Sequence, residues 1–326
     1  MKRFLSVIAI LLAGTSLFAQ GDFKLSEQMF SRINQNPAAI GNNEKIQLFT
    51  ATRLQWASRG LEVTPTSALL NGHAYFESLK SGFGISFIYD ELGLANQTID
   101  AKICYAYNID LSETMLLSLG LSAGVINKRF DPKRHIWKDP SDPAIPTEVV
   151  TTTNFDIDFG LEWSWKYLLV GFSMTHMRNI AREVSTTVAP PHINAYIRGN
   201  IYLPKNFSLV PAAAFQNIGA LSKKTADGAL GQGIEQDNIL DVSLTAMYKG
   251  KYWFGVGYRG GYTGVGGYPF SSDMLSFMIG FEWHWLRLGY CYDMSVGKNL
   301  RQFSSNTHEI TLSFIIPKTK NYVWNY

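Results

Sequence analysis

The clearest strand pattern in the chain is Leu286-Arg287-Leu288-Gly289-Tyr290-Cys291-Tyr292-Asp293, close to the C-terminus. Large apolar side chains alternate here with charged or small ones, a period of two that is typical of a β-strand with one apolar and one polar face. Residues 309–316 repeat the alternation after a polar loop, so the two stretches predict a hairpin. Because the polar face carries full charges in mid-strand, we expect it to face water while the other face suits lipid. The wall of a membrane β-barrel with a wet lumen meets both conditions.

The same alternation recurs along the chain and predicts about fourteen strands, each close to the roughly ten residues that a tilted strand needs to cross a bilayer. They are residues 46–56, 66–76, 82–90, 98–109, 116–126, 155–163, 167–175, 193–203, 207–216, 239–248, 252–260, 274–283, 286–293 and 309–316. An even number lets the first and last strands pair antiparallel, which removes both sheet edges. The predicted fold class is therefore all-β, a transmembrane antiparallel β-barrel.

The connections between these strands alternate between short turns and long loops. Short turns at one end and long loops at the other are typical of outer-membrane barrels, in which the short turns are periplasmic. Aromatic residues gather near the short turns, where an aromatic girdle would meet the lipid–water boundary. The predicted girdle residues are Trp163, Trp165, Tyr167, Tyr248, Tyr252, Trp253, Trp283 and Trp285. The alternative is that they form the core of a soluble β-sandwich.

The N-terminus predicts export. Met1-Lys2-Arg3 is basic, residues 4–12 are apolar, and Ala19-Gln20 is a plausible cleavage point, so residues 1–19 are predicted to be a signal peptide rather than a single anchoring helix. The 326 residues carry a formal net charge of +3, which gives no reason to expect a nucleic-acid partner. The mean hydropathy of −0.03 is compatible with a membrane barrel, because apolar and polar residues alternate along its strands.

Residues 20–43 lack the strand alternation and form a separate N-terminal segment, ahead of a barrel over residues 44–316 and a tail over residues 317–326. A short helical turn is predicted before Asn36-Pro37. The segment is either a periplasmic leader that fills space, or a plug or docking element. Its candidate contact residues are Met29, Phe30, Asn36 and Pro37.

Charged residues on the inward phase of the strands are the candidates for a functional lumen. In residues 155–163 three carboxylates share one face. Their burial would strongly destabilise a sandwich core, whereas a water-filled lumen would solvate them. These charges either form cross-lumen salt bridges or make a polar docking surface for a plug or a client protein. The candidates are Asp100, Lys102, Asp156, Asp158, Glu162, Arg198, Asp241, Arg259, Glu282, Arg287 and Asp293.

The long loop over residues 127–154 is a candidate extracellular contact surface. It places Arg134, His135 and Trp137 together, an exposed aromatic residue among charges, as protein-contact loops often do. A loop folded over the barrel mouth is the alternative.

Signals for an enzyme, a metal or a cofactor are poor. The six histidines form no close metal-ligand spacing with cysteines or carboxylates, and the glycine-rich residues 255–267 lack a P-loop lysine and a following helix. We therefore expect no enzymatic activity, no metal and no cofactor. Cys104 and Cys291 are predicted to face the lumen on strands too far apart for a disulfide.

A series of short motifs extends over nearly the whole mature chain. They are Gln28-Met29-Phe30, Asn36-Pro37-Ala38 with Gly41, Arg53-Leu54-Gln55-Trp56, Pro65-Thr66, Gly82-Phe83-Gly84-Ile85 with Asp90 and Gly93, Asn154-Phe155 with Gly160, Val170-Gly171-Phe172-Ser173, Trp253-Phe254-Gly255 with Tyr258-Arg259, and Gly289-Tyr290-Cys291-Tyr292-Asp293 with His308-Glu309-Ile310. Their order and spacing resemble the PorP/SprF family of Bacteroidota outer-membrane proteins. Two features depart from the family pattern: Ala38-Ala39-Ile40 replaces an aromatic-containing run, and residues 317–326 extend past the last strand.

The resemblance implies a non-enzymatic role in type IX secretion and gliding motility. Members of the family are attached to periplasmic ring and peptidoglycan-binding lipoproteins, or are paired with a large secreted surface adhesin that they help to export or hold. These proteins and outer-membrane lipid are the expected partners, and the outer membrane is the expected location. A passive pore or small-solute transporter is the alternative. An open lumen favours that alternative, whereas a lumen plugged by residues 21–43 or by a partner's tail favours the secretion role.

Overall fold

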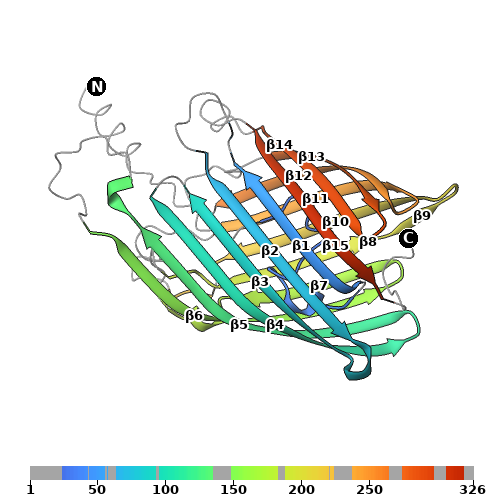
Figure 1. Cartoon of the computed structure of the whole chain (residues 1–326), viewed down its shortest axis with the longest axis horizontal. Coiled ribbons are helices and arrows are strands. Elements are labelled where there is room, and N and C mark those ends of the chain that lie inside the picture. The colour runs from blue at the N-terminus through green and yellow to red at the C-terminus, as the bar shows by residue number, and fades with distance from the viewer. Residues whose placement is uncertain are drawn as a thin grey trace.

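In the computed structural model the chain forms one antiparallel sheet that closes on itself (Figure 1). The structure describes residues 24–42, 44–55, 57, 64–92, 95–134, 148–182, 188–219, 221–223, 237–263, 274–296 and 306–318. Within these residues β8 (His192–Gly199) and β9 (Ile201–Leu203) both pair with β10, so they are one strand interrupted at Asn200. The described part of the chain is therefore a closed barrel of fourteen strands, which confirms the predicted fold class.

Every strand pairs with its neighbours in the chain. The other strands are β1 (Glu44–Leu54), β2 (Thr66–Phe76), β3 (Ser81–Leu92), β4 (Asn96–Ser112), β5 (Met115–Phe130), β6 (Val150–Trp165), β7 (Leu168–Thr175), β10 (Phe207–Ile218), β11 (Asp237–Tyr248), β12 (Tyr252–Thr263), β13 (Met274–Trp283), β14 (Leu286–Ser295) and β15 (Thr307–Pro317). The barrel closes because β1 pairs with β15, as predicted for the first and last strands. A closed sheet leaves no row of unpaired backbone groups to face lipid.

Helices are minor elements. Those in the described residues are four short 3₁₀ turns, and none has the length and apolar character needed to cross a membrane. They are η1 (Pro37–Ala39), η2 (Glu77–Leu79), η3 (Pro132–Arg134) and η4 (Met177–Asn179).

Side chains alternate across the wall as the period of two predicts. In β14, Leu286 and Leu288 are 41% and 39% exposed, whereas Arg287 and Asp293 are 7% and 1% exposed. The same alternation in β6 places its three carboxylates inside the barrel. Both cysteines are free and buried, as expected for inward positions on distant strands.

One predicted girdle residue lies on the opposite face. Trp253 is 3% exposed, and its indole Nε1 donates a hydrogen bond to Glu27 Oε1 at 2.9 Å inside the barrel. Alternation along β12 requires this position, because its neighbours Tyr252 and Phe254 point outward. The girdle prediction is therefore wrong for Trp253, since proximity to a turn does not override strand phase. Trp283, by contrast, is 65% exposed.

The short turns lie together at one end of the barrel (Figure 1). Two of them, Lys205-Asn206 and Lys249-Gly250, have φ between 54° and 64°, as type I′ hairpin turns require at both central residues. The predicted contacts His135 and Trp137, the signal peptide and most of the C-terminal tail lie outside the described residues.

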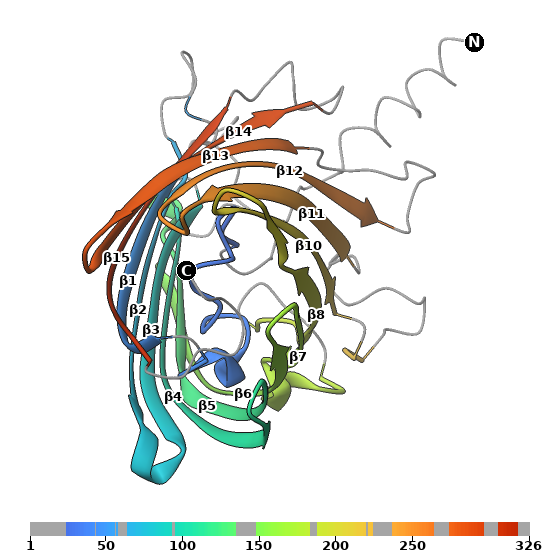
Figure 2. The same cartoon turned by 90° about the vertical axis from the view of Figure 1, so that its right-hand side faces the viewer.

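Residues 24–42 lie inside the barrel rather than beside it. The view along the barrel in Figure 2 shows this segment, in dark blue, enclosed by the ring of strands. We call residues 24–42 the plug.

Candidate functional site

The plug crosses the lumen lengthwise. Near its start, Lys24 Nζ lies 2.5 Å from Asp241 Oδ2 of β11. Near its end, the carbonyl of Gly41 accepts hydrogen bonds from Asn108 Nδ2 of β4 at 3.0 Å and from Lys318 Nζ at 2.8 Å. Asp241 belongs to the half of its strand that adjoins a long loop, while Asn108 adjoins a short turn. The plug therefore runs from the long-loop end to the short-turn end.

Local hydrogen bonds give the plug its shape. A single helical turn is closed by the Asn36 N–H, which donates to the Arg32 carbonyl at 2.8 Å. Asn36 then caps η1, because its Oδ1 accepts from the Ala38 N–H at 2.9 Å. Pro37 occupies the first helical position, where an N–H is not needed. The turn predicted before Asn36-Pro37 is present, but the described helix begins after it.

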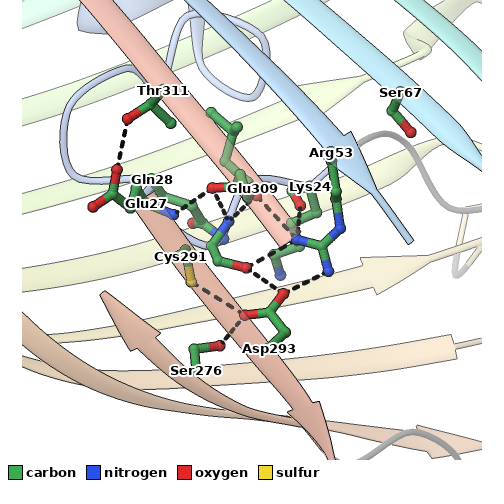
Figure 3. Close-up of polar contacts among 12 residues, drawn as sticks. Lys24, Glu27, Gln28, Arg53, Ser67, Ser276, Cys291, Asp293, Glu309 and Thr311 are labelled. Carbon is green, nitrogen blue, oxygen red and sulfur yellow. Dashed lines mark hydrogen bonds and ion pairs between the residues drawn. The ribbon is translucent and has the colours of Figure 1, made fainter. Parts of the chain in front are cut away.

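Arg53 organises the attachment at the long-loop end (Figure 3). Its guanidinium lies 2.7 Å from Asp293 Oδ2 and 3.0 Å from Glu309 Oε2. Glu309 also accepts the backbone N–H groups of Ser26 and Glu27 at 3.0 Å, and the Ser26 hydroxyl donates to Asp293 at 2.8 Å. These five residues, the Arg53 cluster, join the plug to β1, β14 and β15. The arginine forms ion pairs with both wall carboxylates that bind the plug.

Glu27 adds a second attachment to the same region. Its Oε1 accepts from Trp253 and its Oε2 accepts from the Thr311 hydroxyl at 2.7 Å. Burial raises the pKa of Glu27 to about 7, although the hydrogen bonds from Thr311 and Trp253 act in the opposite direction. The nearby charge of Glu309 raises this pKa further. Both oxygens of Glu27 thus accept hydrogen bonds from the wall.

Glu162 of β6 binds the middle of the plug. The Arg32 guanidinium contacts it through two atoms, Nε to Oε2 at 3.0 Å and Nη2 to Oε1 at 3.1 Å. Such bidentate pairs are stronger and more directional than single contacts. Tyr196 and Asn42 also donate hydrogen bonds to this carboxylate, which is fully buried. A charge on the wall is therefore neutralised by a charge on the plug.

A second buried cluster belongs to the wall alone. Lys102 Nζ lies 2.7 Å from Asp156 and 2.8 Å from Asp158, with Asp100 at 3.3 Å. His176 Nδ1 lies 2.7 Å from Asp156 Oδ2. Asp156, Asp158 and His176 are close enough to share a metal ion, but the Lys102 ammonium already contacts both carboxylates. Lys102 therefore links β4 to β6 as a cross-strand salt bridge.

The remaining lumen charges lie on the inner wall around the plug. Arg198 donates to the Met29 carbonyl at 2.7 Å, and Arg259 donates to the Leu25 carbonyl at 2.8 Å. The Arg287 guanidinium lies 4.5 Å from the centre of the Phe30 ring and 2.9 Å from Glu282. The candidate lumen residues that contact the plug in this way are Glu162, Arg198, Asp241, Arg259, Arg287 and Asp293.

Glycines in the wall make room for the plug. An added Cβ at Gly160 would overlap Asn36 Oδ1, and one at Gly120 would overlap the backbone of Ala38. A Cβ at Gly82 would overlap Ile40, and one at Gly289 would overlap Glu27. Four strands are thus shaped to the plug along its length. The segment is a fitted part of the barrel rather than a leader that fills space.

Little space remains between this part of the plug and the wall. A cavity of about 70 Å³ lies between Met29 and Arg32 of the plug and the inner side chains of β8, β11 and β12, including Tyr196 and Arg198. That volume holds a few water molecules.

Several residues of the site were not among the sequence candidates. Arg53 was missed because the inward positions of β1 also include Phe49 and Ala51, so neither face of that stretch is clearly polar. Glu309 lay on the polar face of a recognised strand and could have been included. Arg32 and Glu27 belong to a segment without periodicity, so no sequence signal indicates their direction. Of the loop candidates, Arg134 makes an exposed ion pair with Glu91 at 2.9 Å.

Comparison with known proteins identifies a family. The family model described as type IX secretion system membrane protein PorP/SprF matches residues 17–314. This match spans most of the chain and confirms the resemblance that the motifs indicated. No curated protein matches the chain.

Solved structures with a similar fold are outer-membrane barrels and channels. The monoaromatic hydrocarbon channel CymD is 13% identical, with 90% of this chain and 94% of that chain covered and a TM-score of 0.53. A deletion mutant of the monoaromatic hydrocarbon channel TodX is 9% identical, with 87% and 93% covered and a TM-score of 0.52. The Acinetobacter baumannii outer membrane protein Omp33 is 10% identical, with 85% and 100% covered and a TM-score of 0.46. At these identities the likeness concerns the fold alone.

Replacing Arg53 tests the charge network. Arg53→Met leaves Asp293 and Glu309 buried without their cation, so we expect the free energy of unfolding to fall by about 3–5 kcal/mol. The control is Arg134→Gln, which removes an exposed pair and is expected to change stability by less than about 1 kcal/mol. The measurement is the urea dependence of heat-modifiable gel mobility in detergent. Equal midpoints for the two variants would show that the Arg53 cluster does not stabilise the barrel.

Replacing Gly160 tests the fit of the plug. Gly160→Ala adds a Cβ where Asn36 Oδ1 lies, so we expect the plug to undock and trypsin to cleave after Arg32. Gly257→Ala is the matched control, because its Cβ would have its nearest neighbours at an ordinary 3.5 Å. Cleavage is followed by mass spectrometry of the folded protein in detergent. If Arg32 stays as protected in Gly160→Ala as in Gly257→Ala, the wall is not fitted closely to the plug.

Proposed function

The chain belongs to the PorP/SprF family of type IX secretion system membrane proteins, and from this premise we propose that it is a non-enzymatic barrel assisting export or surface anchoring of a large cell-surface protein. It is a multi-pass β-barrel of the outer membrane and a component of type IX secretion. The proposal concerns its task within that machinery.

The occupied lumen is the observation that carries the proposal. A passive pore needs a continuous water-filled path, whereas here the Arg32–Glu162 ion pair and the hydrogen bonds from the plug backbone to Glu309 hold the plug along the barrel axis. A protein that holds or guides a partner needs surfaces at its two ends and a rigid wall between them. The plug supplies rigidity, because it links strands on opposite sides of the lumen.

The two ends of the barrel suit different partners. With the short turns in the periplasm, the long loops face the cell surface, where a large secreted adhesin would be held. The short-turn end faces the periplasmic ring or peptidoglycan-binding lipoproteins of the type IX system. We propose this link from the envelope to a surface adhesin as the contribution of the barrel to gliding motility.

The alternative is a passive pore or small-solute transporter. It requires the plug to leave the lumen, because the plug lies lengthwise in the lumen and leaves a cavity of only about 70 Å³ beside Arg32.

The first test is an affinity purification of the tagged protein from crosslinked outer membranes, read by mass spectrometry. We expect one large surface protein, or the periplasmic lipoproteins, to be recovered in near-stoichiometric amount. The control carries the same tag on an unrelated outer-membrane barrel. Recovery of the protein alone, together with steady ion conductance in a planar bilayer, would overturn the proposal in favour of the pore.

A second test asks whether the plug moves. Ser31 of the plug accepts a hydrogen bond from Asn71 of β2 at 2.9 Å, so Ser31→Cys with Asn71→Cys can be bridged by a short thiol crosslinker. Because the plug is held by several buried clusters, we expect the bridged barrel to recover its partner as well as the reduced barrel does. Ser31→Cys alone is the control for crosslinker damage. Loss of partner recovery that reductant restores would mean that the plug must move, contrary to this expectation.

A further inference from the structure

Lysines gather on one arc of the short-turn end. Lys205, Lys249 and Lys251 are exposed, and their turns adjoin one another, since the Lys249 N–H donates to the Asn206 carbonyl at 2.7 Å. Lys166 follows on the neighbouring turn. In the described part of the chain, none of these four lysines forms an ion pair with a carboxylate.

The turns on the opposite arc of the same end carry mainly acidic residues. Its turns carry Glu77, Asp110 and Glu113, all exposed, and Lys80 lies 3.5 Å from Asp110. Among the described hairpin turns of this end, the lysines without acidic partners therefore lie between β6 and β12, while Lys45 of β1 is a further exposed lysine outside the turns. A uniform ring of charge, as solubility alone would favour, is not what the structure has.

Two of these lysines occupy backbone positions that disfavour them. Lys205 and Lys249 have φ of 62° and 54°, in the left-handed region where glycine and asparagine are favoured. Turn formation therefore does not explain the choice of lysine. Residues kept in an unfavourable conformation are candidates for a function of the side chain.

Aromatic rings accompany the lysines at the height of the lipid–water boundary. The Lys166 ammonium lies 5.5 Å from the centre of the Tyr167 ring and 5.9 Å from that of Tyr202. The Lys249 ammonium lies 5.3 Å from the Tyr248 ring. Tyrosine at this depth places its ring in the headgroup layer, so the lysines lie at the level of lipid phosphates.

An apolar groove on the outer wall begins at Tyr248, one of these rings. It has a volume of about 590 Å³, within the ~300–1,000 Å³ typical of ligand clefts. Tyr248 and Tyr252 border it near the turn, and Phe254 and Ile279 border it farther into the wall. Its floor includes Ala246, a small residue among large outward side chains. The groove thus leads from the lysines towards the lipid-facing part of the barrel.

We propose that this arc is a binding site for an anionic phospholipid, with the phosphate on Lys205, Lys249 and Lys251 and an acyl chain in the groove. Charge complementarity selects the headgroup, because each lysine near a membrane surface favours an anionic lipid by about 1 kcal/mol. The apolar groove selects the tail. An acidic protein partner would use the lysines but would leave the lipid-facing groove unused. With the short turns in the periplasm, the site lies in the inner leaflet of the outer membrane.

The test exploits the unfavourable backbone of the two lysines. Lys205→Asn and Lys249→Asn remove the charge while placing a residue that tolerates positive φ, so folding is expected to be retained. The purified barrel is exchanged into vesicles of phosphatidylcholine with a minor fraction of phosphatidylglycerol. Native mass spectrometry then counts the phosphatidylglycerol that is retained after transfer to detergent. We expect about a fivefold weaker preference for phosphatidylglycerol per lysine removed, which corresponds to about 1 kcal/mol.

Two further variants separate the parts of the site. Lys80→Asn, on the opposite arc and also at positive φ, is the matched control and is expected to leave retention unchanged. Ala246→Leu fills the groove and is expected to reduce retention with all four lysines present. Displacement of the bound lipid by inorganic phosphate, or equal retention by Lys249→Asn and Lys80→Asn, would overturn the proposal. If the lysine variants instead lose a periplasmic protein and keep their phosphatidylglycerol, the arc is a protein contact and the lipid site is refuted.

Discussion

The structure depends on the pairing of buried charges between the plug and the inner wall. A barrel of about fourteen strands encloses more space than inward side chains alone fill, so its lumen is either wet or occupied. Here it is occupied, and water no longer solvates Glu162, Asp293 and Glu309. An unpaired carboxylate in that position is strongly unfavourable. Arg32 of the plug pairs with Glu162, while Arg53 of β1 pairs with Asp293 and Glu309 within the wall. The plug adds the N–H groups of Ser26 and Glu27 to Glu309, so docking of the plug completes both sites.

Strand phase and pairing could be predicted from the sequence because both follow from one local rule. A period of two fixes which side chains face inward, and the even strand number fixes how the sheet closes. This is why residues as far apart as Lys102 and Asp293 were correctly assigned to the inner face. The prediction for Trp253 was wrong because its position near a turn was given more weight than its strand phase, which places it inside the barrel.

The contacts of the plug could not be predicted in the same way. Residues 24–42 follow no period, so the sequence gives no direction for Glu27 or Arg32. Their partners, Thr311 and Glu162, are more than a hundred residues away in the chain. The glycines that make room for the plug could not be predicted either. A glycine in a strand can have several structural reasons, and Gly160 is distinguished only by the Asn36 atom that lies against it in the structure.

Alternation of side chains places the charged residues of the wall in two different environments, the enclosed lumen and the exposed turns. Inside, charges are desolvated, so they need ion-pair or hydrogen-bond partners, and these contacts make the lumen rigid. Outside, at the short turns, Lys205 and Lys249 remain in contact with water and are not paired with carboxylates among the described residues. A rigid interior allows charges at the rim to keep a fixed geometry without internal partners. A barrel whose lumen is occupied in this way is suited to hold other molecules at its ends and along its lipid-facing rim.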